Sequence, residues 1–189
     1  MRYSSFLVLL WGLLGCAHTA TQSPVVVAAD ALELHPQEGR FYHQGEPFTG
    51  IGETHYPAGQ RAAMTTYQAG KKQGQHQKWF ETGTLSYQCH YEGNKLHGEA
   101  KSWWTNGRLR TVSRYAYGVG EGLQEQWYRT GERFKRLQLH KGKELGLQQA
   151  WRKNGTLYSN YEVKNGKIYG LKKAGLCYEL DQEEVVYAQ

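Results

Sequence analysis

Proline is absent from residues 58–189 of this 189-residue chain, whose four prolines are Pro24, Pro36, Pro47 and Pro57. Proline cannot donate a backbone hydrogen bond, so its absence suits a sheet that uses every backbone N–H group. A sustained helical period of apolar residues is missing from the same stretch. These two absences favour an all-β fold.

Catalytic and metal-binding signatures are also missing. The chain has no C-x-x-C or H-E-x-x-H spacing, no G-x-S-x-G and no phosphate-binding loop. Three of its eight histidines, His76, His90 and His97, lie near Cys89 in the sequence. The strand register expected below puts His76 and His90 on opposite faces of the sheet. We therefore expect no enzyme activity, no bound metal and no cofactor.

Long hydrophobic runs are scarce. The run Phe6 to Leu14 has nine residues, whereas a helix that spans a bilayer needs about 20. It follows Arg2 and ends in Leu13-Leu14-Gly15-Cys16, which resembles the lipobox of bacterial lipoproteins. The resemblance implies a signal peptide over residues 1–15, cleavage before Cys16, and acyl chains on that cysteine that hold the protein to a membrane. An ordinary secretion signal with an incidental cysteine is the alternative.

This export signal sets the expected location and domain organisation. We expect a lipid-anchored protein of the cell envelope, at the outer membrane and facing the periplasm in a Gram-negative host. Residues 16–38 hold Thr, Gln, Ser, Ala and two prolines, with only a short run of Val25 to Val27, and are expected to form a flexible tether. Residues 39–180 form the folded domain, which begins with an atypical half unit over residues 39–49, and residues 181–189 form a tail. We expect one more strand over residues 171–180 and a last short strand over residues 185–187, and the acidic cluster Asp181 to Glu184 should protect an open sheet edge.

Cysteine is limited to three residues. If Cys16 is lipidated, Cys89 and Cys177 remain, about seven strands apart in the expected sheet. At about 4.8 Å per strand, that separation is roughly 34 Å, too far for a disulfide bond. We expect two free thiols, or an intermolecular bond, with Cys89 a small core residue.

A period of 24 residues dominates what the sequence does contain. The first repeating column is glycine: Gly50, Gly74, Gly98, Gly122, Gly146 and Gly170. Given the first glycine, the chance that the other five positions also hold glycine is about 2 in 100,000. The second column is tryptophan: Trp79, Trp103, Trp127 and Trp151. A further column is Tyr67, Tyr91, Tyr115, Leu139 and Val163.

Each 24-residue unit predicts one β-hairpin. Turn dipeptides recur at Ala58-Gly59, Thr82-Gly83, Asn106-Gly107, Thr130-Gly131 and Asn154-Gly155. Asn-Gly between apolar runs favours a two-residue type I′ turn. A second set of turns joins the units at Ala69-Gly70, Gly93-Asn94, Gly118, Lys141-Gly142 and Asn165-Gly166. The sequence therefore predicts an elongated single antiparallel sheet of tandem hairpins.

Two-residue turns also predict the two faces of the sheet. They put Trp104 opposite Leu109 and Trp103 opposite Arg110. One face then carries Tyr56, Phe80, Trp104 and Tyr128, with Leu85, Leu109, Leu157, the glycine column and the tyrosine column. We expect this face to be packed, with each tyrosine over a bare glycine. The more open face carries the tryptophan column with Lys101, Arg110, Arg114 and Glu125.

The segment Tyr67 to Gly74 has the pattern Tyr-x-x-Gly-Lys-x-x-Gly, followed by Trp79-Phe80 and Gly83. This pattern resembles the MORN repeat in its bacterial variant, and its arrangement is similar to that of YwqK-type antitoxins. The resemblance covers about residues 40 to 180. It implies a long twisted antiparallel sheet of β-hairpins and no enzymatic residues.

Two functions are compatible with these features. The first is a scaffold that binds a protein or an envelope polysaccharide through its aromatic rows. The alternative is an antitoxin or immunity protein that neutralises a toxin. The candidate binding residues are Trp79, Trp103, Trp127, Trp151, Arg110 and Arg114, because tryptophan and arginine are favoured interface anchors; the tryptophan row could instead only pack the sheet. After signal removal, 22 basic and 17 acidic residues alternate in sign, which disfavours nucleic-acid binding.

Overall fold

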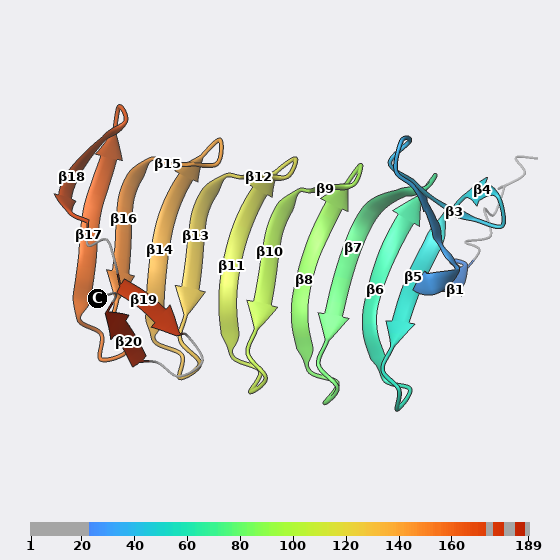
Figure 1. Ribbon diagram of the computed structural model, residues 1–189, viewed down its shortest axis with the longest axis horizontal. Coiled ribbons are helices and arrows are strands. Elements are labelled where there is room, and N and C mark those ends of the chain that lie inside the picture. The colour runs from blue at the N-terminus through green and yellow to red at the C-terminus, as the bar shows by residue number, and fades with distance from the viewer. Residues whose placement is uncertain (1–22, 173–175, 180–183, 188–189) are drawn as a thin grey trace, which may run out of the picture.

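A long open sheet dominates the computed structural model, which describes residues 23–172, 176–179 and 184–187 (Figure 1). The 15-stranded sheet is not closed, and its strands follow the order of the chain. All of its pairs are antiparallel except one parallel pair at the N-terminal end. The predicted all-β sheet of tandem hairpins is confirmed.

Five hairpins build the sheet. They are β5 (Gly50–His55) with β6 (Arg61–Gln68), β7 (Lys71–Trp79) with β8 (Leu85–Glu92), β10 (Gly98–Trp103) with β11 (Leu109–Ala116), β13 (Gly122–Trp127) with β14 (Arg133–His140), and β16 (Gly146–Trp151) with β17 (Leu157–Lys164). β18 (Lys167–Leu171) is the last strand, at the C-terminal end of the sheet. Three short strands join successive hairpins: β9 (Lys95–Leu96), β12 (Val119–Gly120) and β15 (Lys143–Glu144).

The N-terminal segment caps the first hairpin. Its elements are β1 (Val26–Ala28), the 3-10 helix η1 (Ala29–Ala31), and a separate three-stranded sheet of β2 (Glu33–His35), β3 (Arg40–His43) and β4 (Glu46–Pro47). The Ile51 N–H donates to the Val25 carbonyl at 2.8 Å, and β1 runs parallel to β5. The Phe41 ring lies 5.1 Å from the Tyr67 ring. The expected flexible tether is therefore wrong for residues 23–38, which hold two strands: β1 pairs with the edge of β5, which would otherwise be open, and β2 pairs with β3.

The C-terminal end differs from the expected strand over residues 171–180. β18 ends at Leu171, and a separate hairpin pairs β19 (Leu176–Glu179) with β20 (Glu184–Tyr187), which confirms the short strand expected over residues 185–187. Asp181 and Glu183 of the acidic cluster lie outside the described residues.

The turn within each hairpin has three residues, which corrects the two-residue expectation. In the third hairpin, the Gly107 N–H donates to the Trp104 carbonyl and the Trp104 N–H to the Arg108 carbonyl, both at 2.8 Å. Gly107 alone in this turn has a positive φ, +79°, as a type I turn followed by a left-handed residue requires. The Asn106 side chain accepts a bond from the Arg108 N–H and donates to the Arg129 carbonyl of the next hairpin. These two side-chain bonds favour the longer turn.

The type I′ turns lie between the hairpins instead. Gly93 and Asn94 have φ values of +54° and +69°, and Asn165 and Gly166 have +52° and +73°. Positive φ at both central residues defines this turn. The predicted positions of the connecting turns are confirmed.

A β-bulge beside each three-residue turn restores the expected register. Ser102 lies opposite Thr111, but the next residue, Trp103, lies opposite Leu109, so Arg110 has no partner. The same shift occurs beside the other tryptophans of the column. Pairing farther from the turn follows the prediction, and Gly98 lies opposite Tyr115. The predicted pairing of Trp103 with Arg110 is wrong.

Burial separates the two faces. In the five hairpins, every buried side chain lies on the face of the glycine and tyrosine columns, here called the core face: Thr65, Tyr67, Cys89, Ala100, Trp104, Gln124, Tyr128, Phe134, Gln148, Ala150, Tyr158, Ser159, Tyr161 and Val163. The opposite face, which carries the tryptophan column, is here called the tryptophan face. The predicted packed and open faces are confirmed.

Candidate binding surface

The tryptophan face carries a continuous row of large side chains near the three-residue turns. β7, β10, β13 and β16 each end in a tryptophan of the column. Their register partners on the adjoining strands are Leu85, Leu109, Arg133 and Leu157. Each tryptophan is partly exposed, and none is buried. Large aromatic side chains that remain partly exposed are suited to contact a partner.

Bonds from the neighbouring hairpin hold the tryptophan backbone. The Tyr56 hydroxyl donates to the Trp79 carbonyl at 2.8 Å, and the Tyr128 hydroxyl donates to the Trp151 carbonyl at 2.9 Å. The Trp104 indole N–H donates to the Trp127 carbonyl at 3.2 Å. Each bond crosses from one repeat to the next, so the row is fixed by the core face behind it. A preorganised row loses less conformational entropy when a partner binds.

Arginines from adjacent strands cover part of the row. The Arg61 guanidinium lies 5.5 Å from the Trp79 ring centroid and pairs with Glu53 at 2.9 Å. The Arg133 guanidinium lies 5.5 Å from the Trp151 ring centroid. These cation–π contacts leave one side of the two indoles occupied.

The bulge places several predicted residues on the other face. Arg110 was expected beside the tryptophan row, but its guanidinium lies 4.5 Å from the centroid of Trp104 on the core face. Leu85, Leu109 and Leu157 were expected on the packed face, but they lie opposite the tryptophans. Both errors have one cause, because the residue added by the bulge reverses the alternation of side chains next to the turn.

Arg114 does share the tryptophan face, at the far end of its strand. It pairs with Glu99 at 3.3 Å, and Lys101 pairs with the same carboxylate at 2.6 Å. The structure therefore brings the four tryptophans together but not Arg110, and it places Arg114 away from the row. Sequence reasoning missed Arg61 and Arg133, although both recur in the 24-residue column of Leu85.

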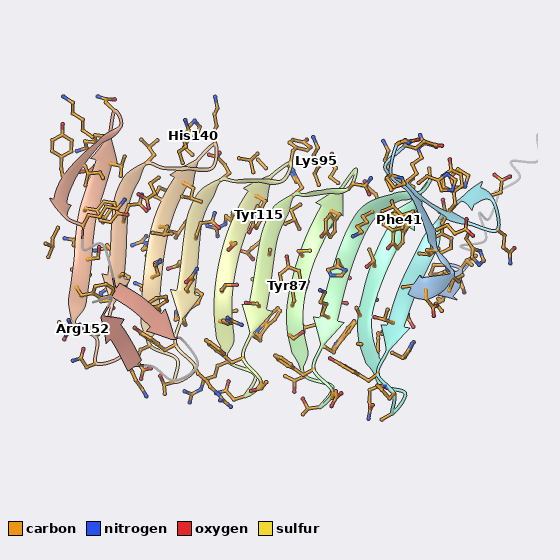
Figure 2. All side chains as sticks on the ribbon, in the orientation of Figure 1. Phe41, Tyr87, Lys95, Tyr115, His140 and Arg152 are labelled. Carbon is orange, nitrogen blue, oxygen red and sulfur yellow. The ribbon has the colours of Figure 1, made fainter. Side chains whose placement is uncertain are left out.

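The two long edges of the sheet, which the turns form at the ends of the strands, carry different basic residues. Figure 2 shows Arg152 at the edge of the three-residue turns, and Lys95 and His140 at the opposite edge. The turn segments beside the tryptophan row, residues 55–62, 79–86, 103–110, 127–134 and 151–158, hold seven basic residues and two acidic ones. The basic residues are Arg61, Arg108, Arg110, Arg129, Arg133, Arg152 and Lys153. At the opposite edge, the segments 68–74, 92–98, 116–122, 140–146 and 164–170 hold lysines and no arginine.

A shallow hollow lies on the same face, towards the ends of the strands that are farther from the row. Its volume is about 170 Å³, and Leu123, Arg136, Gln138 and Leu147 line it. Leu147 is 47% exposed. An exposed apolar side chain beside an arginine adds contact surface to the tryptophan face away from the row.

Of the histidines near the described cysteine in the sequence, His76 lies away from this surface with Cys89, and His90 does not. His76 and Cys89 face each other on the core face, whereas His90 lies opposite Gln75 on the tryptophan face, as the register predicts. Burial, aided by Lys78 and Lys72, lowers the pKa of His76 to about 4. Cys89 is a buried free thiol, as expected, and burial raises its pKa. The side chain of Cys177 lies outside those described. No group of three or more His, Cys, Asp or Glu residues is placed to hold a metal ion within the described part.

The repeated hairpins, turns and bulges define a tandem β-hairpin repeat protein with one packed face and one open aromatic face. The family model of the MORN repeat variant matches residues 72–92, which form the hairpin of β7 and β8. The neighbouring hairpins share its bulge and its opposed glycine and tyrosine columns, which supports a MORN-type repeat protein. A comparison with curated proteins found no match.

Cys16 and the signal segment lie outside the described residues. Within the described part, no helix has the length and hydrophobicity needed to cross a membrane.

Proposed function

We propose that this protein is a non-enzymatic repeat scaffold of the cell envelope, anchored by lipid on Cys16, that binds a protein or an envelope polymer along its tryptophan face. The observation that carries the proposal is the row of partly exposed tryptophans on the face opposite the core. The MORN-type repeat supports the scaffold role. In a Gram-negative host, the protein would lie at the outer membrane and face the periplasm.

The anchor is tested by metabolic labelling with a fatty-acid analogue. The wild-type chain should take up the label, and Cys16→Ser should not, because the thioether forms on that sulfur. Equal labelling of both proteins would contradict lipidation at Cys16.

The binding face is tested by site-specific photo-cross-linking in intact cells. A photoreactive phenylalanine analogue replaces Arg136, an exposed residue on the tryptophan face, and in a matched control it replaces Lys78, an exposed residue on the core face. Adducts should form from position 136 and not from position 78. Equal adducts at both positions would contradict the choice of face, and no adduct at either would contradict binding.

A further inference from the structure

We propose that the tryptophan row binds an acidic peptide segment in the polyproline II conformation, with one turn of the peptide for each interval between successive tryptophans. This inference rests on the proposed function, since it requires the tryptophan face to be the binding surface.

The spacing of the row matches this conformation. Successive tryptophans of the column lie two strands apart in the sheet, which is about 9.6 Å at about 4.8 Å per strand. A polyproline II helix has three residues per turn and rises about 3.1 Å per residue, so it repeats every ~9.3 Å. An extended β-strand repeats its side-chain direction every ~6.8 Å and falls out of step with the row after one interval.

The form of the row also suits a polyproline II ridge. Trp79 and Trp151 each have an arginine over one ring face, so those indoles do not offer both faces for flat stacking. Leu85, Leu109 and Arg133 alternate with the tryptophans along the row. Proline-rich segments dock against aromatic side chains, and their stiff backbone limits the entropy lost on binding.

The charge of the adjoining edge selects an acidic segment. The turn segments that flank the row hold seven basic and two acidic residues; without Arg110, whose guanidinium lies on the core face, six basic residues remain, and five of them are arginines. Arg108 and Arg129 are exposed in these turns. Arginine forms paired hydrogen bonds with carboxylates, so glutamate or aspartate between the prolines would meet a complementary edge.

The test measures binding of synthetic peptides to the detergent-solubilised full chain by isothermal titration calorimetry. The peptides are (Pro-Pro-Glu)n with n of 2, 4 and 6, a basic (Pro-Pro-Lys)4 peptide, and a flexible (Gly-Ser-Glu)4 peptide. Four tryptophans span three intervals, about 29 Å, which a polyproline II helix covers with about 9–10 residues. Affinity should therefore rise about tenfold from n = 2 to n = 4 and less than threefold from n = 4 to n = 6.

Matched charge variants identify the edge that is used. Arg108→Gln with Arg129→Gln should weaken binding of (Pro-Pro-Glu)4 about fivefold. Lys95→Gln with Lys143→Gln removes the same charge from the opposite edge and should leave binding unchanged. A melting temperature close to that of the wild type in both double variants shows that the comparison concerns binding and not folding.

Several results would overturn the inference. They are equal affinity for the acidic and basic peptides, equal affinity for the flexible peptide, affinity that keeps rising in proportion to length, and binding of the anionic polysaccharide alginate without binding of any peptide. Cross-linking distinguishes failure of this inference from failure of the proposed function. Adducts at position 136 without peptide binding would support the scaffold function and contradict an acidic polyproline II peptide as its partner. The absence of both adducts and peptide binding would contradict both proposals.

Discussion

Replacement of Gln148 by alanine should destabilise the protein more than any other change from glutamine to alanine in the last hairpin. The Gln148 side chain is fully buried, with 0% exposure, on the core face where β14, β15 and β16 meet. Its Oε1 accepts a bond from the Gln138 N–H at 3.1 Å. Its Nε2 donates to the carbonyls of Gln138 at 2.8 Å, and of Leu145 and Gly146 at 3.3 Å each. The side chain thus bonds backbone groups at the irregular entry of β16, where the Gln138 carbonyl also accepts a bond from the Leu145 N–H at 3.0 Å.

The expected loss of stability follows from the hydrogen bonds that alanine would remove from these backbone groups. A buried N–H without a partner costs about 1–3 kcal/mol, and the short bond to the Gln138 carbonyl adds about 1 kcal/mol. The two longer bonds add less. We therefore expect Gln148→Ala to lower the free energy of unfolding by about 3 kcal/mol. Gln124 makes the same set of bonds in the preceding hairpin, so Gln124→Ala should have a comparable cost.

Urea unfolding followed by circular dichroism measures this cost, with Gln149→Ala as the control. Gln149 is the next residue, but it lies on the tryptophan face, where its only described side-chain bond is to Asn160 at 3.2 Å. Its replacement should cost less than about 0.5 kcal/mol. Equal losses for Gln148→Ala and Gln149→Ala would refute the assignment of core face and tryptophan face.

Two further predictions concern the turns and the response to pH. Gly107→Val should destabilise the protein by about 1–2 kcal/mol more than Thr105→Val in the same urea assay, because Gly107 has a φ of +79° and a β-branched residue is strained there. His76 has a folded-state pKa of about 4, below the ordinary value of 6.5, so the unfolded chain binds this proton more readily. Stability should be full above about pH 6.5 and fall as the pH drops towards 4. His76→Gln should reduce that fall in stability, whereas His90→Gln on the exposed face should not. The measurement is the melting temperature as a function of pH. The same pH dependence in His76→Gln and in the wild type would contradict His76 as the cause of the fall.

Sequence periodicity was enough to predict the hairpins and the strand faces far from the turns. Columns that recur every 24 residues predict which residues of the two strands lie opposite each other in each hairpin. Gly98 and Tyr115 are opposite each other, as predicted. The expected packing of the tyrosine over the glycine is wrong at this position, because a side-chain carbon at Gly98 would have no atom within 4 Å. Alternation along the strands then placed Ala100 on the core side and Lys101 on the open side, and the structure agrees.

Side-chain positions next to the turns could not be predicted in the same way. The number of residues in a turn depends on contacts that it makes with another hairpin, such as the bond from Asn106 to the Arg129 carbonyl. One added turn residue and one bulge then exchanged the faces of Leu109 and Arg110. The residues that line the binding surface beside the tryptophans were therefore only partly predictable.

Local alternation and turn residues control strand pairing, so the repeat, its hairpin unit and the two faces of the sheet were predictable from the sequence. The turn type, the bulge and the role of residues 23–38 depend on contacts between distant parts of the chain. The composition of this N-terminal segment indicated that it would not fold alone. Val25 and its neighbours nevertheless gain backbone hydrogen bonds from the open edge of β5, which exists only after the sheet has formed.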